Sequence, residues 1–505
     1  LSLAHRELNS VFDRDWRSIK KNEIKNLIKA SSGLFFEALS NVELASCGEE
    51  VKIKFDVINR SPYPIKLDKI QLNEKEFIID DSLKNNKLFS VEKSFQLPLE
   101  HEVSEKYWLK NPSEFGSYNI DDQKLITEPD NKPVLEAKFI FKVNGQQISY
   151  ISPVTYKLNS PINGDEYRPF NIGNPIYLNP KNDLEYLVNT NKKNLEVEVI
   201  SGANNMSARI YLDAPEGTKV DPEFYDINFK NNNEKKLLNF NVSLSDNKNS
   251  INKVSYKAKI HDKIFSRGIN KIIYSHISHQ TRFPKSEVSL IKFDLNVKAK
   301  NIAYIMGSGD KIPESLSLVG YKVDLFEKND INIDNLKDYD ALIVGVRAFN
   351  SDKSLLDIKP QLMNFMESGG NVIIQYNTSR NLDVNKFSPY PFTLSRNRVS
   401  QENAPVRIIN SKHPALNYPN KISLEDFNEW VQERGLYFPN SWSNDFETII
   451  SSNDKGESPN NGGILISKVG EGYFVYTSYS WFRQLPAGVS GAYKIFTNLI
   501  SLGKK

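Results

Sequence analysis

The spacing of hydrophobic residues changes twice along the chain, and each change predicts a different kind of structure. In Glu23–Ala38 the hydrophobic positions roughly follow the i, i+3, i+4 spacing of one helix face, so we expect a short helical lead-in over residues 1–40 that packs on a neighbouring domain. From about residue 42 the hydrophobic period becomes two, and Val51–Val57 is the clearest example. A period of two is typical of strands with one buried face.

Short alternating strands separated by Pro, Gly and Asn turns predict two antiparallel β-sandwich domains. We expect an Ig-like domain over residues 41–160 and a second sandwich over residues 161–298, with the turn-rich segment Asn159–Pro169 as the linker. The expected strands include Ile65–Leu72, Leu135–Val143, Gln147–Ile151, Leu195–Ile200, Ala208–Leu212, Leu237–Leu244, Val254–Ile260 and Lys271–His276.

After residue 300 the strands become continuous hydrophobic runs that alternate with helical patterns. Such runs suit strands buried on both faces, so residues 299–505 are predicted to form a doubly wound α/β domain with a parallel sheet, flavodoxin-like or amidotransferase-like in class. The expected strands are Ile302–Met306, Tyr321–Phe326, Ala341–Gly345 and Asn371–Tyr376, followed by a hairpin or edge pair, Gly462–Ser467 and Gly472–Ser478. The expected helices are Ile312–Val319, Pro360–Glu367 and Ala492–Leu502.

Length and charge narrow the classes of function. The chain has 505 residues, enough for three or four domains, and a formal net charge of only +3. Because positive and negative charges nearly cancel, neither nucleic acid nor an acidic membrane is expected as the main partner. No segment approaches the roughly 18 uninterrupted hydrophobic residues of a membrane span. A single cysteine, Cys47, excludes an intrachain disulfide and any cysteine-based zinc ribbon.

The loops that follow the parallel strands hold the candidate ligand residues. Ligands of open parallel sheets bind beyond the carboxyl ends of the strands, where loops and helix N-termini meet. An arginine beside a glycine-rich turn suits a carboxylate, a phosphate or a sugar hydroxyl. The alternative is a vestigial cleft whose charged residues pair with one another. The candidates are Gly307, Gly309, Asp310, Arg347, Asn350, Tyr376, Asn377, Arg483 and Gln484.

Recognisable catalytic machinery is absent from the sequence. The position at which an α/β hydrolase or an amidotransferase carries its nucleophile is occupied by Tyr376-Asn377, and Cys47 lies in the first sandwich. Only His276 and His279 are close in sequence, and neither has an adjacent carboxylate cluster, so a structural or surface role is favoured over metal binding. We therefore expect no catalytic residue and no metal ligand in this chain.

Several sequence strings resemble one family. They are Asp426–Pro439, Gly470–Ser478 and Phe482–Tyr493 near the C-terminus, with Ser32–Ala38, Tyr107–Leu109, Gly164–Pro169 and Tyr274–Ile277 before them. Together they resemble the C-terminal region of large Bacteroidetes proteins of the PIG-L (LmbE-like) deacetylase family. The resemblance extends along nearly the whole chain.

The resemblance implies a secreted parent protein with an N-terminal zinc-dependent de-N-acetylase domain, sandwich domains, and a C-terminal domain similar to class I glutamine amidotransferases or ThuA-like proteins. The His-Pro-Asp-Asp type motif that holds zinc in that family does not occur here, so no zinc ligand is transferred to this chain and zinc is implied only for the deacetylase domain. Because the chain starts at Leu1 without a Met, we expect that domain to precede it. Export to the periplasm or cell surface of a Gram-negative bacterium follows from the same resemblance.

Three hypotheses follow. The first is a non-catalytic accessory region that recognises a glycan, or that positions the deacetylase domain of the same parent on a partner. The second is a structural or protein-interaction module that contacts other cell-surface proteins. The third is a ThuA-like sugar-modifying enzyme that uses Asp310, Arg347 and Asn377, which requires two or more of these side chains to converge.

Overall fold

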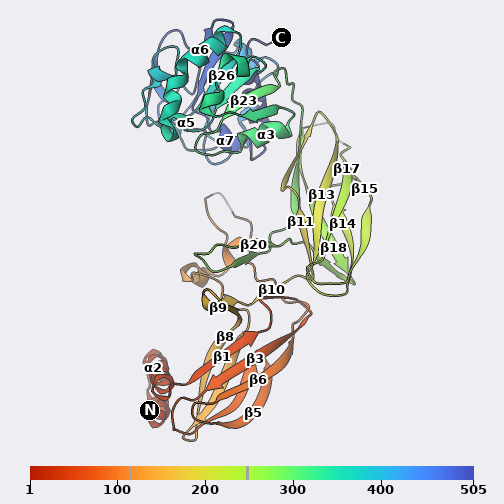
Figure 1. The fold of residues 1–505 in the computed structure, drawn as a ribbon, viewed down its shortest axis with the longest axis vertical. Helices are drawn as coiled ribbons and strands as arrows, with labels where there is room; N and C mark the ends of the chain where they lie inside the picture. Colours follow the sequence, from red (N-terminus) through yellow and green to blue (C-terminus); the bar gives the residue numbers. More distant parts are fainter. Residues whose placement is uncertain (114–115, 246–248, 505) are drawn as a thin grey trace. The chain divides into compact units, whose positions relative to one another are not determined.

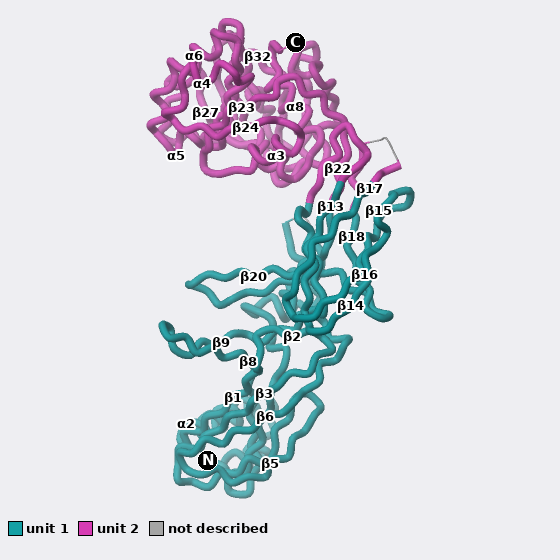
Figure 2. Tube along the Cα trace, turned by 45° about the vertical axis from the view of Figure 1, so that its right-hand side comes forward, with its two compact units in different colours: residues 1–183, 194–242, 254–288 teal, residues 184–193, 243–253, 289–505 magenta. Residues whose placement is uncertain are grey.

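The protein is mostly β-structure with short helices and contains several separate sheets (Figure 1). Its structure is a computed structural model that describes residues 1–113, 116–245 and 249–504. The chain forms two compact units (Figure 2). Unit 1 contains residues 1–183, 194–242 and 254–288, and unit 2 contains residues 184–193, 243–253 and 289–505.

Unit 1 begins with two helices, α1 (Ser2–Glu7) and α2 (Arg14–Ser32). Asp13 caps α2 by accepting hydrogen bonds from the backbone N–H groups of Asp15 and Trp16, both at 2.9 Å. The helix predicted over Glu23–Ala38 is too long at its C-terminal end. It stops at Ser32 because Gly33 adopts the left-handed conformation that ends many helices, and strand β1 (Phe35–Ser40) follows.

The first sheet of unit 1 has the strand order β5-β4-β7-β8-β1-β3-β6, with β9 paired to β8. Apart from the parallel pair of β1 and β8, the neighbours are antiparallel. In β3 the predicted alternation is confirmed, because Val51, Ile53, Phe55 and Val57 are all buried. The strands are β3 (Glu50–Ile58), β4 (Ile65–Leu72), β5 (Lys75–Leu83), β6 (Leu88–Gln96), β7 (Glu136–Val143), β8 (Gln146–Ser160) and β9 (Gly164–Pro169).

The prediction of a linker over Asn159–Pro169 is wrong, because these residues belong to a hairpin. Strand β8 runs on to Ser160, the chain turns, and β9 returns antiparallel to it. The Pro, Asn and Gly residues therefore mark the tight turn of a hairpin within one sheet, which uses the same turn formers as a linker.

The rest of unit 1 is also β-structure. A four-stranded sheet has the order β11-β13-β17-β15, and β14 lies antiparallel to both β16 and β18. The predicted strands are confirmed, except that Lys271–His276 contributes only the short β20. The strands that belong wholly or mainly to unit 1 are β2 (Leu44–Ser46), β10 (Asn171–Gly173), β11 (Ile176–Pro180), β13 (Lys192–Ser201), β14 (Met206–Asp213), β15 (Lys219–Asp221), β16 (Phe224–Phe229), β17 (Lys235–Ser243), β18 (Ser250–Ile260), β19 (Lys263–Phe265), β20 (Asn270–Ile272) and β21 (Gln280–Arg282).

Unit 2 is built on a mixed sheet of order β24-β23-β25-β26-β35-β34-β32. Its first five strands are parallel, and β34 and β32 are antiparallel to their neighbours. These strands are β23 (Asn301–Ile305), β24 (Lys322–Leu325), β25 (Ala341–Val344), β26 (Asn371–Gln375), β32 (Glu447–Thr448), β34 (Ile464–Val469) and β35 (Gly472–Thr477). The continuous burial predicted from the hydrophobic runs is confirmed, since every residue of β25 and β26 is buried.

Helices pack on both faces of this sheet. Residues of α3 and α8 join one hydrophobic cluster with Tyr304 and Ile343, whereas α5 and α6 join another with Ala303 and Leu342. Successive strand residues thus face opposite layers. The helices are α3 (Ile312–Leu318), α4 (Ile333–Leu336), α5 (Ala348–Ser351), α6 (Lys359–Glu367), α7 (Trp481–Gln484) and α8 (Ser490–Ile500), and the short outer strands are β27 (Phe392–Leu394), β28 (Arg398–Val399), β29 (Val406–Ile408), β30 (Gly435–Leu436), β31 (Pro439–Trp442) and β33 (Ile450–Ser452).

Unit 2 also incorporates a strand from earlier in the chain. Strand β12 (Leu184–Val188) pairs in parallel with β22 (Glu287–Phe293). The Tyr186 hydroxyl donates to the Leu485 carbonyl at 3.0 Å and accepts from the Tyr493 hydroxyl at 3.1 Å. Unit 2 therefore also contains residues 184–193, 243–253 and 289–298, which precede residue 299 in the chain.

Candidate functional site

All the residues predicted for a ligand site lie along the carboxyl edge of the parallel strands in unit 2. Gly307, Gly309 and Asp310 follow β23, Arg347 and Asn350 follow β25, Tyr376 and Asn377 follow β26, and Arg483 and Gln484 belong to α7 after β35. Strands β24 and β25 flank β23, so the direction of winding changes beside β23. A crevice is expected at such a point.

The loops after β23 and β25 close this crevice with their own backbones. The Ser308 N–H donates to the Val346 carbonyl at 2.8 Å, and the Gly345 N–H donates to the Ile305 carbonyl at 2.8 Å. A Cβ atom at Gly307 would lie 2.1 Å from the Val346 carbonyl oxygen. Gly307 is therefore required for the close approach of two loops, and the two backbones leave no room there for a phosphate.

Asp310 points into the fold at the same place. Its carboxylate accepts hydrogen bonds from the Tyr304 hydroxyl at 2.8 Å, from the Ile312 N–H at 3.0 Å and from the Val346 N–H at 3.4 Å. The Gln375 amide in turn donates to the Tyr304 hydroxyl at 2.9 Å. Burial raises the pKa of Asp310 above its ordinary value, although these hydrogen bonds oppose the shift. Asp310 thus ties β23, β25 and β26 together.

Three more of the predicted residues form hydrogen bonds with the backbone of the loops at this edge of the sheet. Asn350 pairs with the backbone of Thr378, accepting from its N–H at 2.7 Å and donating to its carbonyl at 3.2 Å. Asn377 is fully buried and donates to the Gln375 carbonyl at 3.0 Å. Gln484 is fully buried and accepts from the Val431 N–H at 2.8 Å.

The remaining predicted residues form a surface of aromatic rings and arginines. Tyr376 stacks on Tyr437, with ring planes 4° apart and centroids 6.2 Å apart, and contacts Phe482 at 5.5 Å. Arg483 lies over the Phe482 ring, 4.9 Å from its centroid. Tyr437 and Phe482 are half-buried, so each presents part of its ring to solvent. We call Tyr376, Tyr437, Phe482, Arg347 and Arg483 the edge surface.

The two arginines of the edge surface differ in their partners. Arg483 donates to Glu433 at 2.8 Å, and its charge is balanced by that carboxylate. Arg347 is exposed, and within the described ranges its guanidinium has no ion-pair partner. Its backbone has a φ of +57°, a left-handed conformation that is unusual for a residue with a Cβ atom. Such conformations gather at functional sites.

Tyr376 lies beside Arg347, whose backbone N–H donates to the Tyr376 carbonyl at 2.9 Å. Burial raises the pKa of Tyr376, and the nearby charge of Arg347 acts in the opposite direction. No residue that the structure describes hydrogen-bonds to the hydroxyl. Tyr376 is only 7% exposed, but among the described residues neither its neutral hydroxyl nor the Arg347 guanidinium has a partner, so both can bond to hydroxyl or acidic groups of a ligand.

Asp310, Arg347 and Asn377 differ in their surroundings. Asp310 and Asn377 bond to the protein's own backbone and buried side chains, whereas Arg347 projects outward. Among the described residues, no cluster of three or more His, Cys, Asp and Glu side chains could hold a metal ion.

The other sequence candidates for chemistry lie in unit 1. Cys47 is buried, and burial raises the pKa of its thiol to about 11, which disfavours the nucleophilic thiolate. His276 is exposed beside the Tyr274 ring, and the Nδ1 atom of His279 lies 3.8 Å from Glu43.

Sequence reasoning missed Tyr437, Phe482 and Glu433. Tyr437 comes from the segment between β30 and β31, which enters the chain between β26 and β35, so its contact with Tyr376 depends on the tertiary fold. A signal was available for Phe482, since it immediately precedes the candidate Arg483.

No family model and no curated protein matches the chain. Among solved structures, the native conformation of E. coli alpha-2-macroglobulin is similar to this chain at 8% sequence identity and a TM-score of 0.18. The match covers 52% of this chain and 17% of that one, and a likeness at this score carries no argument about function. No described helix combines the length and the hydrophobicity needed to cross a membrane.

Proposed function

We propose that this chain is a non-catalytic, glycan-binding accessory region of a secreted PIG-L-type deacetylase. The edge surface is the observation that carries the glycan-binding role. Partly exposed aromatic rings beside hydrogen-bonding groups suit a sugar, because the C–H face of the ring packs on them while its hydroxyl groups bond to polar side chains. The attachment to a deacetylase parent rests on the resemblance of the sequence strings.

The fold is consistent with this proposal. The parallel strand order β24-β23-β25-β26-β35 corresponds to the 2-1-3-4-5 order of flavodoxin-like domains. We assign unit 2 to that class as an amidotransferase-like domain without a nucleophile, and the β-structure of unit 1 to sandwich domains. In this assignment the edge surface occupies the edge at which related folds bind their substrates.

Charge indicates which glycans the edge surface prefers. The Arg483 charge is balanced by Glu433, whereas the part of the chain that the structure describes offers Arg347 no ion-pair partner. A sugar that carries a carboxylate or another acidic substituent therefore gains a charge-assisted hydrogen bond. Arg347 is exposed, so salt screens this contribution. We therefore expect acidic glycans to bind more tightly than neutral glycans at low salt.

A glycan array probed with the purified chain tests the proposal. Arg347→Asn removes the charge while keeping a residue type that tolerates the left-handed backbone. Tyr376→Phe removes only the hydroxyl. We expect each variant to weaken binding of the best glycan by about tenfold, as the loss of one hydrogen bond to a charged or well-placed group would do.

Arg396→Asn is the matched control, since Arg396 is an exposed arginine of unit 2 outside the edge surface. It should bind like the unmodified chain. An array on which no glycan binds, or on which Arg347→Asn and Tyr376→Phe bind unchanged, refutes the glycan-binding role. In the parent protein, deletion of this region should lower deacetylation of a polymeric substrate and spare a small soluble one. Equal effects on both substrates contradict the accessory role.

A further inference from the structure

Unit 1 contains a cavity of about 360 Å³ that lies within the size range of ligand pockets, roughly 300–1,000 Å³. Its lining comes from five segments that are far apart in sequence: residues 104–106, 130–134, 153–155, 167–171 and 278–281. Two of the segments that resemble the PIG-L family contribute to this lining or adjoin it. Gly164–Pro169 contributes Tyr167 and Pro169, and the hairpin loop that begins with Tyr274–Ile277 continues into the lining.

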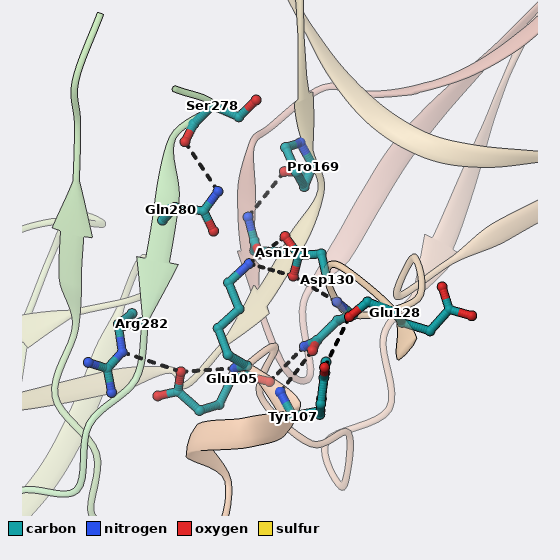
Figure 3. Close-up of polar contacts among 11 residues, drawn as sticks. Glu105, Tyr107, Glu128, Asp130, Pro169, Asn171, Ser278, Gln280 and Arg282 are labelled. Atoms are coloured by element: carbon teal, nitrogen blue, oxygen red, sulfur yellow. Dashed lines mark hydrogen bonds and ion pairs between the residues drawn. The ribbon is translucent and has the colours of Figure 1, made fainter. Parts of the chain in front are cut away.

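The buried carboxylate of Glu105 accepts hydrogen bonds from backbone groups beside this cavity. One of its oxygens accepts from the Lys106 N–H at 2.9 Å and the other from the Phe283 N–H at 2.7 Å. The Glu105 carbonyl accepts from the Asn131 amide at 2.7 Å. Figure 3 shows Glu105 between Arg282 and the segment that carries Asp130. Two of the five segments, and Arg282 and Phe283 just after a third, are therefore held together before any ligand binds, which reduces the entropy lost on binding.

The main charges of the cavity cancel. The Lys106 ammonium donates to both oxygens of Asp130, at 2.7 and 2.8 Å. Lys132, at the rim, is exposed to solvent, which screens its charge. His279 faces Glu43 at 3.8 Å. A cavity without an unbalanced buried charge favours an uncharged ligand, because a charged ligand would lose its hydration without gaining a counter-ion.

Polar groups with remaining hydrogen-bonding capacity surround the space. Asn171 uses its amide nitrogen to donate to the Pro169 carbonyl at 3.1 Å, and Gln280 uses its own to donate to the Ser278 carbonyl at 3.2 Å. In both cases the amide oxygen is left as an acceptor, and the half-exposed Asp130 carboxylate is a third. Figure 3 shows Asp130, Asn171 and Gln280 on separate segments around this space.

The apolar part of the lining comprises three prolines and the side chains of Val134, Val154, Phe170 and Tyr167. Pro133, Pro153 and Pro169 contribute rigid, flat hydrocarbon surface with no backbone N–H. The cavity thus combines hydrocarbon faces, several separate acceptors and one ammonium group. An uncharged ring with hydroxyl groups on its edge and C–H groups on its faces fits this combination.

From this geometry we infer that the unit 1 cavity binds a neutral pyranose sugar unit, at a site separate from the edge surface. Asn171, Gln280 and Asp130 accept from sugar hydroxyl groups, and Lys106 donates to them. The prolines contact the ring. The inference goes beyond the proposed function, since it concerns another unit and a ligand of different charge.

Saturation-transfer NMR and calorimetry on the full chain test this inference with three probes: glucose, N-acetylglucosamine and glucuronate. We expect at least one of the neutral sugars to bind saturably at millimolar concentration and glucuronate to bind more weakly. Asn171→Ala and Gln280→Ala should each reduce the affinity roughly three- to tenfold, the loss of one neutral hydrogen bond. Gln147→Ala is the matched control, because Gln147 is an exposed glutamine of unit 1 that makes one hydrogen bond outside the cavity.

Asp130→Asn gives a gain of binding that misfolding cannot imitate. It keeps the shape of the side chain and frees the Lys106 charge, so the variant should bind glucuronate more tightly than the unmodified chain does. The inference is overturned if no neutral sugar saturates the signal, if the unmodified chain prefers glucuronate, or if Asn171→Ala and Gln280→Ala bind unchanged. It is also overturned if Arg347→Asn abolishes the neutral-sugar signal, which would assign that signal to the edge surface. Failure of the array variants alone would refute the proposed function and leave this cavity site standing.

Discussion

The substitution Gly307→Ala tests whether the crevice beside β23 is closed by backbone contact. The added methyl carbon would lie 2.1 Å from the Val346 carbonyl oxygen, 2.8 Å from its carbonyl carbon and 3.0 Å from the Ala348 nitrogen. All three are backbone atoms, so no side chain can rotate away. The two loops must separate, and the 2.8 Å hydrogen bond from Ser308 to Val346 lengthens or breaks.

The size of this effect follows from its two parts. Overpacking of a tight site destabilises proteins by about 1–3 kcal/mol. Loss of one backbone hydrogen bond adds about 1 kcal/mol. We therefore expect Gly307→Ala to lower the free energy of unfolding of unit 2 by about 2–4 kcal/mol.

Gly309→Ala is the matched comparison two residues away. Gly309 has a φ of +93°, but a Cβ atom there would meet no atom within 4 Å. Only the backbone conformation opposes this substitution, and it should cost about 1–2 kcal/mol. The two glycines therefore separate steric collision from backbone strain.

Urea unfolding followed by tryptophan fluorescence measures both variants. Trp430, Trp442 and Trp481 all belong to unit 2, so the fluorescence transition reports mainly on this unit. Hydrogen exchange of the peptide spanning residues 300–350 locates the effect. If Gly307→Ala costs no more than Gly309→Ala, or if exchange in this peptide does not rise, the closed-crevice interpretation is wrong.

Three further predictions concern buried polar groups of unit 2. Burial raises the folded-state pKa of Asp310, so the free energy of unfolding should fall as the pH rises from 3.8, the ordinary pKa of an aspartate, toward neutrality. Asp310→Asn should flatten that part of a pH series of urea unfolding. Burial lowers the pKa of His413, so stability should be lost as pH falls below its ordinary value of 6.5, and His413→Gln should remove this loss from the same series; an unchanged slope contradicts the argument. Arg434→Ala leaves the carbonyls of Ala404 and Phe427 without their donor and should lower the free energy of unfolding by about 2–4 kcal/mol, whereas a change within experimental error would show that water replaces the guanidinium.

Local sequence patterns predicted which segments form strands better than they predicted the residues at which helices and strands begin and end. The runs around Ala341–Val344 and Asn371–Gln375 are hydrophobic on both faces, and both are buried strands. The helix end at Ser32 was missed because Leu34, Phe35 and Ala38 suit a helix face and a strand equally over so short a stretch. The turn-forming residues at Ser160–Gly164 suit a hairpin and a linker equally, so the sequence does not distinguish the two structures.

The sequence by itself determined the order of strands and helices, the edge of the sheet on which the polar loops gather, and the residues Tyr376 and Asn377 that follow β26. These features depend on residues close together in the chain, where the period of hydrophobic positions and the turn formers act. Only the tertiary structure decided which side chains face solvent. Asp310 turns inward because Val346, 36 residues away, supplies an N–H, and Tyr376 meets Tyr437 because a later segment folds back onto the edge. The cavity of unit 1 is likewise assembled from five distant segments, since its walls depend on strand pairing and on Glu105 rather than on any local pattern.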